Sequence, residues 1–160
     1  MEIRRILEYA LAREYMGKNF FIENADKLQN PAASGAFKTI AGEEQKHIEF
    51  ISALMTAIDG GITAESHELP EAGFFADRAN SESIDQTIIE SMVSDLPVLR
   101  MAYLIERDFA EFYAMAAQQA DGEAKKLLEL LAKWESTHER LFKKMYDRLF
   151  NMYSEMPWGG

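Results

Sequence analysis

The residues of this chain with the clearest chemistry are four glutamates and two histidines in a repeated pattern. Two of the glutamates are followed three positions later by a histidine, and a single glutamate precedes each pair by 30 residues in one case and 29 in the other. The six residues are Glu14, Glu44, His47, Glu106, Glu135 and His138. Carboxylate oxygens combined with imidazole nitrogens suit iron or manganese better than calcium or a structural zinc ion. With neutral imidazoles the set carries a charge of −4, which two divalent cations would balance.

These six positions interrupt apolar stripes that have the period of an α-helix. Apolar residues recur at steps of three and four through segments that we place at about 2–29, 34–59, 96–120 and 123–154. A Glu and a His at positions i and i+3 share one helix face, so they can point at one ion while the single Glu faces it from a partner helix. A buried carboxylate without a partner is costly or takes up a proton, so four in one core predict a metal site. The alternative is a metal-free helical interaction domain with a buried polar network.

The connections between these segments predict an all-α fold of two helical hairpins in a four-helix bundle. The first and last connections are short and force antiparallel neighbours, whereas residues 60–95 form a crossover long enough to travel the length of the bundle. A capping-box pattern within it predicts a short helix over about 84–93. Asp95, two residues before Pro97, is interpreted as the N-cap of the third long helix. We expect a single domain over residues 1–160.

Composition and charge exclude several classes of function. The chain has 17 Lys and Arg against 27 Asp and Glu, a net charge of −10, which leaves no basic surface for nucleic acid or an anionic membrane. Because it has no cysteine, it holds neither a disulfide nor a thiolate-bound metal cluster. No stretch approaches the roughly 18 apolar residues of a membrane span, and the N-terminus lacks the features of a signal peptide. We expect a soluble, cytoplasmic protein.

Two further positions bear on the site. Tyr113 follows Glu106 by seven residues, two turns along the same face, so its hydroxyl would support the site or act as a redox group; a core tyrosine with a satisfied hydroxyl is the alternative. The matching position after Glu14 is Phe21, which has no hydroxyl. Glu43 competes with its neighbour as a ligand, but only that neighbour stands three residues before a histidine.

Four short segments carry a resemblance to a known family. They are Ala12-Arg13-Glu14, Gly42–His47 (GEEQKH), Ile105-Glu106 and Trp134–His138 (WESTH). They resemble the ferritin-like superfamily, and within it the rubrerythrin-related proteins that lack a rubredoxin domain. Two single glutamates with two Glu-x-x-His motifs form the ligand pattern of ferritin-like di-iron and di-manganese proteins. The resemblance covers about 3–58 and 97–152, so the crossover contributes no motif.

The resemblance implies a ferritin-like bundle that holds two iron ions, or manganese or a mixed pair. In that pattern Glu44 and Glu135 would bridge the metals, Glu14 and Glu106 would be terminal ligands, and each histidine would bind one metal. Such sites oxidise ferrous iron or reduce hydrogen peroxide or dioxygen, which implies an oxidoreductase with a role in oxidative stress. A non-catalytic iron-binding or storage protein is the alternative. Rubrerythrin-like chains commonly form homodimers, which we expect here as well.

Two features of rubrerythrin peroxidases have no counterpart in this sequence. Those proteins usually carry an additional site glutamate near the third-helix ligand, but the residues three positions from Glu106 are Tyr103 and Phe109. They also carry a cysteine-bound rubredoxin iron that delivers electrons, and this chain has no cysteine. The electron donor would therefore be a separate, unknown partner.

Overall fold

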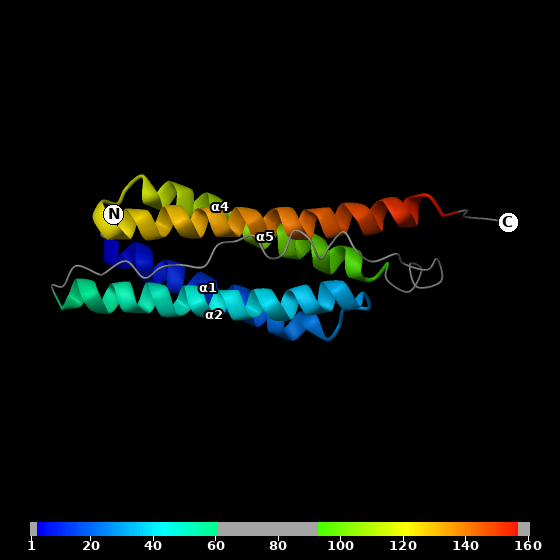
Figure 1. Cartoon of the computed structure of the whole chain (residues 1–160), viewed down its shortest axis with the longest axis horizontal. Helices are drawn as coiled ribbons and strands as arrows, with labels where there is room; N and C mark the ends of the chain where they lie inside the picture. Colours follow the sequence, from blue (N-terminus) through cyan, green and yellow to red (C-terminus); the bar gives the residue numbers. More distant parts are fainter. Residues whose placement is uncertain (1–2, 61–92, 157–160) are drawn as a thin grey trace.

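Four long helices make up the part of the chain that the computed structural model describes, residues 3–60 and 93–156. They are α1 (Ile3–Ala25), α2 (Pro31–Asp59), α4 (Asp95–Ala117) and α5 (Gly122–Ser154), and the described residues contain no strand. Figure 1 shows an elongated bundle in which α1 lies beside α2 and α4 lies beside α5. The all-α four-helix bundle that the apolar periodicity predicts is confirmed.

The loop between α1 and α2 begins and ends differently from the prediction. α1 ends at Ala25 instead of near 29, and α2 begins at Pro31 instead of 34. The side chain of Asn30 accepts a hydrogen bond from the Ala33 amide at 3.0 Å, so Asn30 is the N-cap of α2. Pro31 then takes the first helical position, where its missing amide hydrogen costs nothing. The proline therefore starts this helix.

Asp95 is not an N-cap, and that prediction is wrong. α4 begins at Asp95 itself, with Ser94 before it, and the helix ends at Ala117 instead of 120. The Asp95 carboxylate, 1% exposed, accepts hydrogen bonds from the backbone amides of Gln29 at 2.9 Å and Asn30 at 2.8 Å. It thus fastens the start of α4 to the loop between α1 and α2.

The other end of the first hairpin is closed by an ion pair between Arg4 of α1 and Asp59 of α2. Most of the crossover prediction, including nearly all of the short helix expected over 84–93, falls on residues 61–92 and lies outside the described residues. None of the described helices combines the length and the apolar character that crossing a membrane requires.

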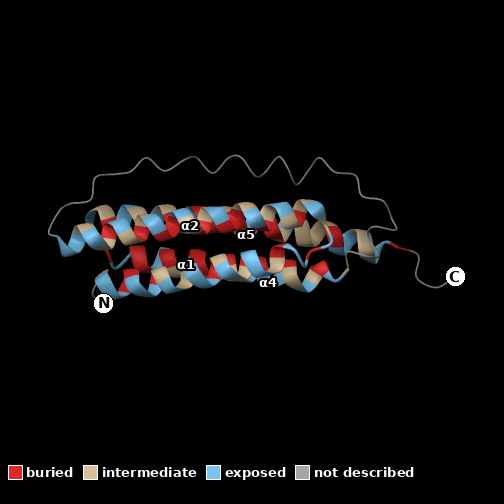
Figure 2. Cartoon of the chain, turned by 90° about the horizontal axis from the view of Figure 1, so that it is seen from below, coloured by how far each residue is buried: buried red, intermediate tan, exposed pale blue. Residues whose placement is uncertain are grey.

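The buried residues lie on the inner faces of the four helices, as the colouring of Figure 2 shows. These side chains form two apolar clusters. We name one the Phe21 cluster, because it contains the rings of Phe21, Phe37 and Phe142. The other, the Tyr113 cluster, contains Tyr113 with aliphatic residues such as Ile51 and Leu128. Along every helix the predicted metal ligands lie between the residues of these two clusters.

Candidate metal centre

The six predicted ligands come together in one buried layer of the bundle. α1 supplies one glutamate, α2 a Glu-His pair, α4 one glutamate and α5 a second Glu-His pair. Five of them are 0% exposed, and His138 is 6% exposed. Their ligand-capable atoms form two groups, each within 4.8 Å, that share two residues. The groups are Glu14, Glu44, His47 and Glu135, and Glu44, Glu106, Glu135 and His138.

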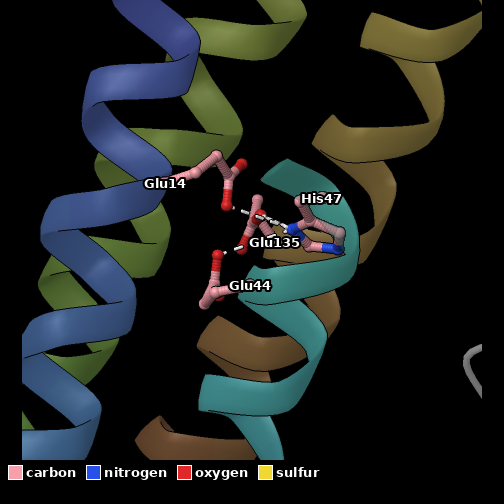
Figure 3. A group of neighbouring side chains, drawn as sticks. All are labelled: Glu14, Glu44, His47 and Glu135. Atoms are coloured by element: carbon pink, nitrogen blue, oxygen red, sulfur yellow. Dashed lines mark hydrogen bonds and ion pairs between the residues drawn. The ribbon is translucent and has the colours of Figure 1, made fainter. Parts of the chain in front are cut away.

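The first group is arranged around the Nδ1 atom of His47, as Figure 3 shows. This nitrogen lies 3.2 Å from Oε2 of Glu14, 3.5 Å from Oε2 of Glu44 and 3.0 Å from Oε1 of Glu135. Only the contact with Glu14 has the geometry of a hydrogen bond. The other oxygen of Glu14 accepts a hydrogen bond from the Tyr113 hydroxyl, which reaches it from α4.

The second group has the same composition but fewer hydrogen bonds. Nδ1 of His138 lies 3.3 Å from Oε2 of Glu135, 3.7 Å from Oε1 of Glu106 and 3.8 Å from Oε1 of Glu44. None of these contacts is a hydrogen bond, and the His138 ring lies nearly parallel to the His47 ring with 6.1 Å between centroids. The two imidazoles therefore face one inner space from α2 and α5.

The cluster satisfies its polar atoms poorly without a metal. Within the described residues, both oxygens of Glu44, Glu106 and Glu135 are buried and have no hydrogen-bond partner, and the same is true of His138 Nδ1. Buried polar atoms in this state are costly and rare in native structures. Divalent cations satisfy carboxylate oxygens and an imidazole nitrogen directly, and the donor set is that of ferritin-like di-iron proteins. The arrangement therefore fits a di-iron site.

The electrostatics of the metal-free cluster favour bound protons on three of the residues. Burial, together with the neighbouring carboxylates, raises the pKa of Glu44 and of Glu106 well above the ordinary glutamate value. Burial alone would lower the pKa of His47, but the charges of Glu14 and Glu135 outweigh it and raise that pKa well above the ordinary histidine value. A cation that binds here must displace these protons.

Glu135 behaves in the opposite sense. Burial alone would raise its pKa, but the interaction with the nearby Glu106 carboxyl and the charge of His47 outweigh burial and lower the pKa below the ordinary glutamate value. Glu135 therefore stays ionised within the cluster. Burial and the charge of Glu14 raise the pKa of Tyr113, so its hydroxyl keeps its proton.

For three residues beside the cluster, the structure corrects or extends what the sequence predicts. Glu43, the competing glutamate, is only partly buried and pairs with Lys46 at 3.4 Å. Tyr113 bonds to Glu14 on α1 and not to Glu106 on its own helix. Sequence reasoning gave no role to the ring of Trp134, which stacks on His47 with centroids 5.0 Å apart. Its position directly before a ligand glutamate was the available signal.

Comparisons with known proteins agree with this geometry. A sequence model of the rubrerythrin family matches residues 5–146. A solved structure, a hypothetical protein from Pyrococcus furiosus, is similar with a TM-score of 0.68 and 23% identity, over 98% of this chain and 94% of that chain, and it supports the fold. No curated protein matches the chain. The family match includes most of each of the four helices and all six cluster residues, and the chain therefore belongs to the rubrerythrin family.

Proposed function

We propose that this protein is a di-iron carboxylate oxidoreductase that oxidises ferrous iron and reduces hydrogen peroxide or dioxygen. The observation that carries the proposal is the buried set of unpartnered carboxylate oxygens and imidazole nitrogens in a rubrerythrin-family bundle. Two ferrous ions held there would supply the two electrons that, with two protons, reduce one hydrogen peroxide to two waters as both ions become ferric.

The shared residues of the two groups suggest the role of each ligand. Glu44 and Glu135 belong to both groups, so they would bridge the two ions, one from each hairpin. Glu14 and Glu106 each belong to one group and would be terminal ligands. His47 and His138 would each bind one ion through Nδ1, the nitrogen that faces the carboxylates.

The protein's own residues protect and orient this centre. The apolar clusters on both sides exclude water, so charge interactions within the cluster are stronger than they would be in solvent. Tyr113 holds Oε1 of Glu14 by a hydrogen bond and keeps a proton at its hydroxyl beside the site. Because these 160 residues include no cysteine, they hold no thiolate-bound iron centre that could return electrons to the site, and we propose a separate electron donor.

We propose a homodimer for this oxidoreductase. Most exposed large hydrophobic side chains of the described residues lie on two helices, α1 and α4, and those are Tyr9, Tyr15, Met16, Ile22, Met101, Leu104 and Met115. A second copy that packs against α1 and α4 would cover part of these side chains. Light scattering after size exclusion should give twice the chain mass, and Met16→Arg should shift the species toward monomer. A monomer at every protein concentration contradicts the dimer.

Metal analysis of protein from iron-supplemented growth tests the site. The unmodified chain should hold about two iron ions, the number that this ligand pattern takes. Glu44→Gln combined with Glu135→Gln should abolish iron binding, because each replaced carboxylate belongs to both groups. Glu43→Gln is the matched control, since it removes a neighbouring carboxylate on the outside of α2. Equal metal content in all three proteins would contradict a metal centre here.

Stopped-flow mixing of the diferrous protein with hydrogen peroxide, and separately with dioxygen, tests the reaction. Rapid appearance of ferric absorption with one oxidant and slow appearance with the other identifies the oxidant. Two bound ferrous ions that neither oxidant oxidises would overturn the oxidoreductase and leave iron binding or storage.

A further inference from the structure

The two terminal carboxylates of the cluster are held very differently. Both oxygens of Glu14 have hydrogen bonds, one from the Tyr113 hydroxyl on α4 and one with Nδ1 of His47 on α2, at 3.2 Å. Nδ1 of His47 is itself the expected ligand atom, so its contact with Glu14 would give way to the ion, whereas the Tyr113 hydroxyl lies outside the set of ligands. A hydrogen bond from such an outer group fixes the orientation of a metal ligand and raises metal affinity. Glu14 is therefore positioned for its ion before the ion arrives.

Glu106 has no such support. Neither of its oxygens has a hydrogen bond among the described residues, although the side chain is 0% exposed. Nδ1 of His138 lies 3.7 Å from Oε1 of Glu106, beyond hydrogen-bond distance. No hydrogen bond within the described residues therefore fixes the orientation of the Glu106 carboxylate.

The two histidines follow the same division. His47 is fully buried and its ring stacks on Trp134 with an interplanar angle of 20°. The side chain of His138 is 8% exposed, which makes it the one member of the six that solvent touches. The loosely held carboxylate and the solvent-touched imidazole thus belong to the same group.

A single pair of matching residues accounts for the difference between the carboxylates. Tyr113 follows Glu106 by seven positions, and Phe21 follows Glu14 by seven positions. Both side chains are 0% exposed, but only the tyrosine brings a hydroxyl, and it serves the glutamate of the other hairpin. By the same repeat, Phe21 stands where a hydroxyl would serve Glu106.

We propose that the position formed by Glu106 and His138 is the exchangeable one, at which a divalent cation enters and leaves, whereas the position formed by Glu14 and His47 retains its ion. This rests on the proposed function only in requiring that the cluster bind two divalent cations. A ferrous ion used as substrate would pass through the exchangeable position.

Release of cobalt measures the difference directly. The metal-free protein is loaded with two equivalents of Co²⁺, whose visible absorption reports its binding, and mixed with excess EDTA. We expect two phases of equal amplitude with rates at least about tenfold apart, the lower end of the effect of such supporting contacts. Glu106→Gln should retain the slow phase alone. Two cobalt ions lost in one phase, or loss of the slow phase in Glu106→Gln, would overturn the proposal.

Tyr113→Phe tests the physical cause. Removal of its hydroxyl should accelerate the slow phase by about 10- to 100-fold and leave the fast phase unchanged. Tyr103→Phe is the matched control, because it removes the hydroxyl of another buried tyrosine of α4 that has no hydrogen bond to the cluster among the described residues. The reciprocal change Phe21→Tyr should slow the fast phase. An unchanged slow phase in Tyr113→Phe contradicts the assigned cause.

The outcomes also separate this proposal from the proposed reaction. If no cobalt binds, both fail, because the cluster is then not a cation site. If two ions leave in one phase while the diferrous protein reacts with peroxide, only the inequality fails. If two phases are seen but neither oxidant reacts, only the oxidoreductase fails.

Discussion

The α1–α2 hairpin and the α4–α5 hairpin present the same ligands at the same offsets, yet they differ at the positions beside those ligands. Three residues after the single glutamate the first hairpin has Gly17 and the second has Phe109. These two positions face each other: a Cβ on Gly17 would lie 2.8 Å from Cε2 of Phe109. A large ring in one half thus requires the smallest residue in the other. The two halves of the site therefore need the same ligand residues, but the residues that pack beside those ligands can differ in size between the two hairpins.

The two apolar clusters on either side of the site also differ in the residues at matching positions. The second helices of the hairpins place Phe37 and Leu128 at matching positions, and Ile51 and Phe142 at another. In the folded bundle Phe37 and Phe142 pack with Phe21 in one cluster. Ile51 and Leu128 pack with Tyr113 in the other. One side of the site therefore packs three phenylalanine rings together, whereas the other combines aliphatic side chains with the rings of Phe109, Tyr113 and Trp134.

Metal loading should have the largest effect on the free energy of unfolding, because the ions would join the two hairpins at their centre. At a hundred times the dissociation constant each site adds about 2.7 kcal/mol, so two sites add about 5 kcal/mol. For a chain of this size that is a rise in melting temperature of about 10–20 °C. Calorimetry with and without Mn²⁺ measures it. A similar rise in Glu44→Gln combined with Glu135→Gln would show that the ions act elsewhere.

Removal of the Phe142 ring, which packs on two other rings, should cost more stability than the matching change at Ile51 in the Tyr113 cluster. Phe142→Ala should destabilise the protein by about 3–5 kcal/mol. It should exceed Ile51→Ala by about 1–2 kcal/mol, since the ring of Phe142 also stacks on Phe21 at 5.4 Å and meets Phe37 edge-on at 5.2 Å. Urea denaturation of the metal-free proteins provides both values. An equal or larger loss for Ile51→Ala contradicts the distinction between the two clusters.

The metal-free protein should become less stable as pH rises. Burial raises the pKa of Glu44 and of Glu106. Burial alone would lower the pKa of His47, but the nearby carboxylates outweigh it and raise that pKa. The folded state therefore keeps protons that the unfolded chain releases. Each retained proton lowers the unfolding free energy by about 1.4 kcal/mol per pH unit, over the window from the ordinary pKa up to the raised one. Glu135, whose pKa is lowered, acts only in acid below the ordinary glutamate value of 4.5.

Urea denaturation from about pH 5 to about pH 8 measures this slope. Glu106→Gln should flatten it, because glutamine has no proton to release. Metal-free protein whose stability rises over this range contradicts the raised pKa values.

Asp95→Ala should loosen one inter-helix loop and spare the other. The loss of a buried carboxylate that accepts two backbone amides should cost about 2 kcal/mol. Hydrogen exchange should quicken at the amides of Gln29 and Asn30, and remain unchanged in the loop at 118–121, which has no bond to Asp95. Faster exchange in both loops would indicate general destabilisation.

Gly17→Ala should have the smallest effect. The added methyl group must displace the Phe109 ring, over which the Arg13 guanidinium sits at 4.8 Å, but alanine also favours the helix by up to about 1 kcal/mol. We expect a net loss of about 1 kcal/mol, measured by thermal unfolding. Gly35→Ala is the control, because a Cβ there meets nothing within 4 Å and should stabilise the chain. A gain at both positions contradicts close contact between the hairpins at Gly17.

The fold class and the grouping of the six cluster residues could be predicted because both follow from local periodicity. Glutamates such as Glu14 and Glu44 stand where a helical stripe demands an apolar residue, and helix geometry alone puts them on the inner face. The family follows from the same motifs and is confirmed. Helix ends were less predictable, since capping by Asn30 and the early start at Pro31 depend on loop geometry as well as on residue type.

The partners of individual side chains could not be predicted. Asp95 has the residue type of an N-cap, but it bonds to a loop more than sixty positions away in the chain. Tyr113 shares a face with Glu106, but its hydroxyl reaches Glu14. The sequence by itself determined which residues face inward, because that depends on the turn of one helix. Only the tertiary structure decided which inward groups touch, because that depends on how far neighbouring helices slide along one another when their side chains pack.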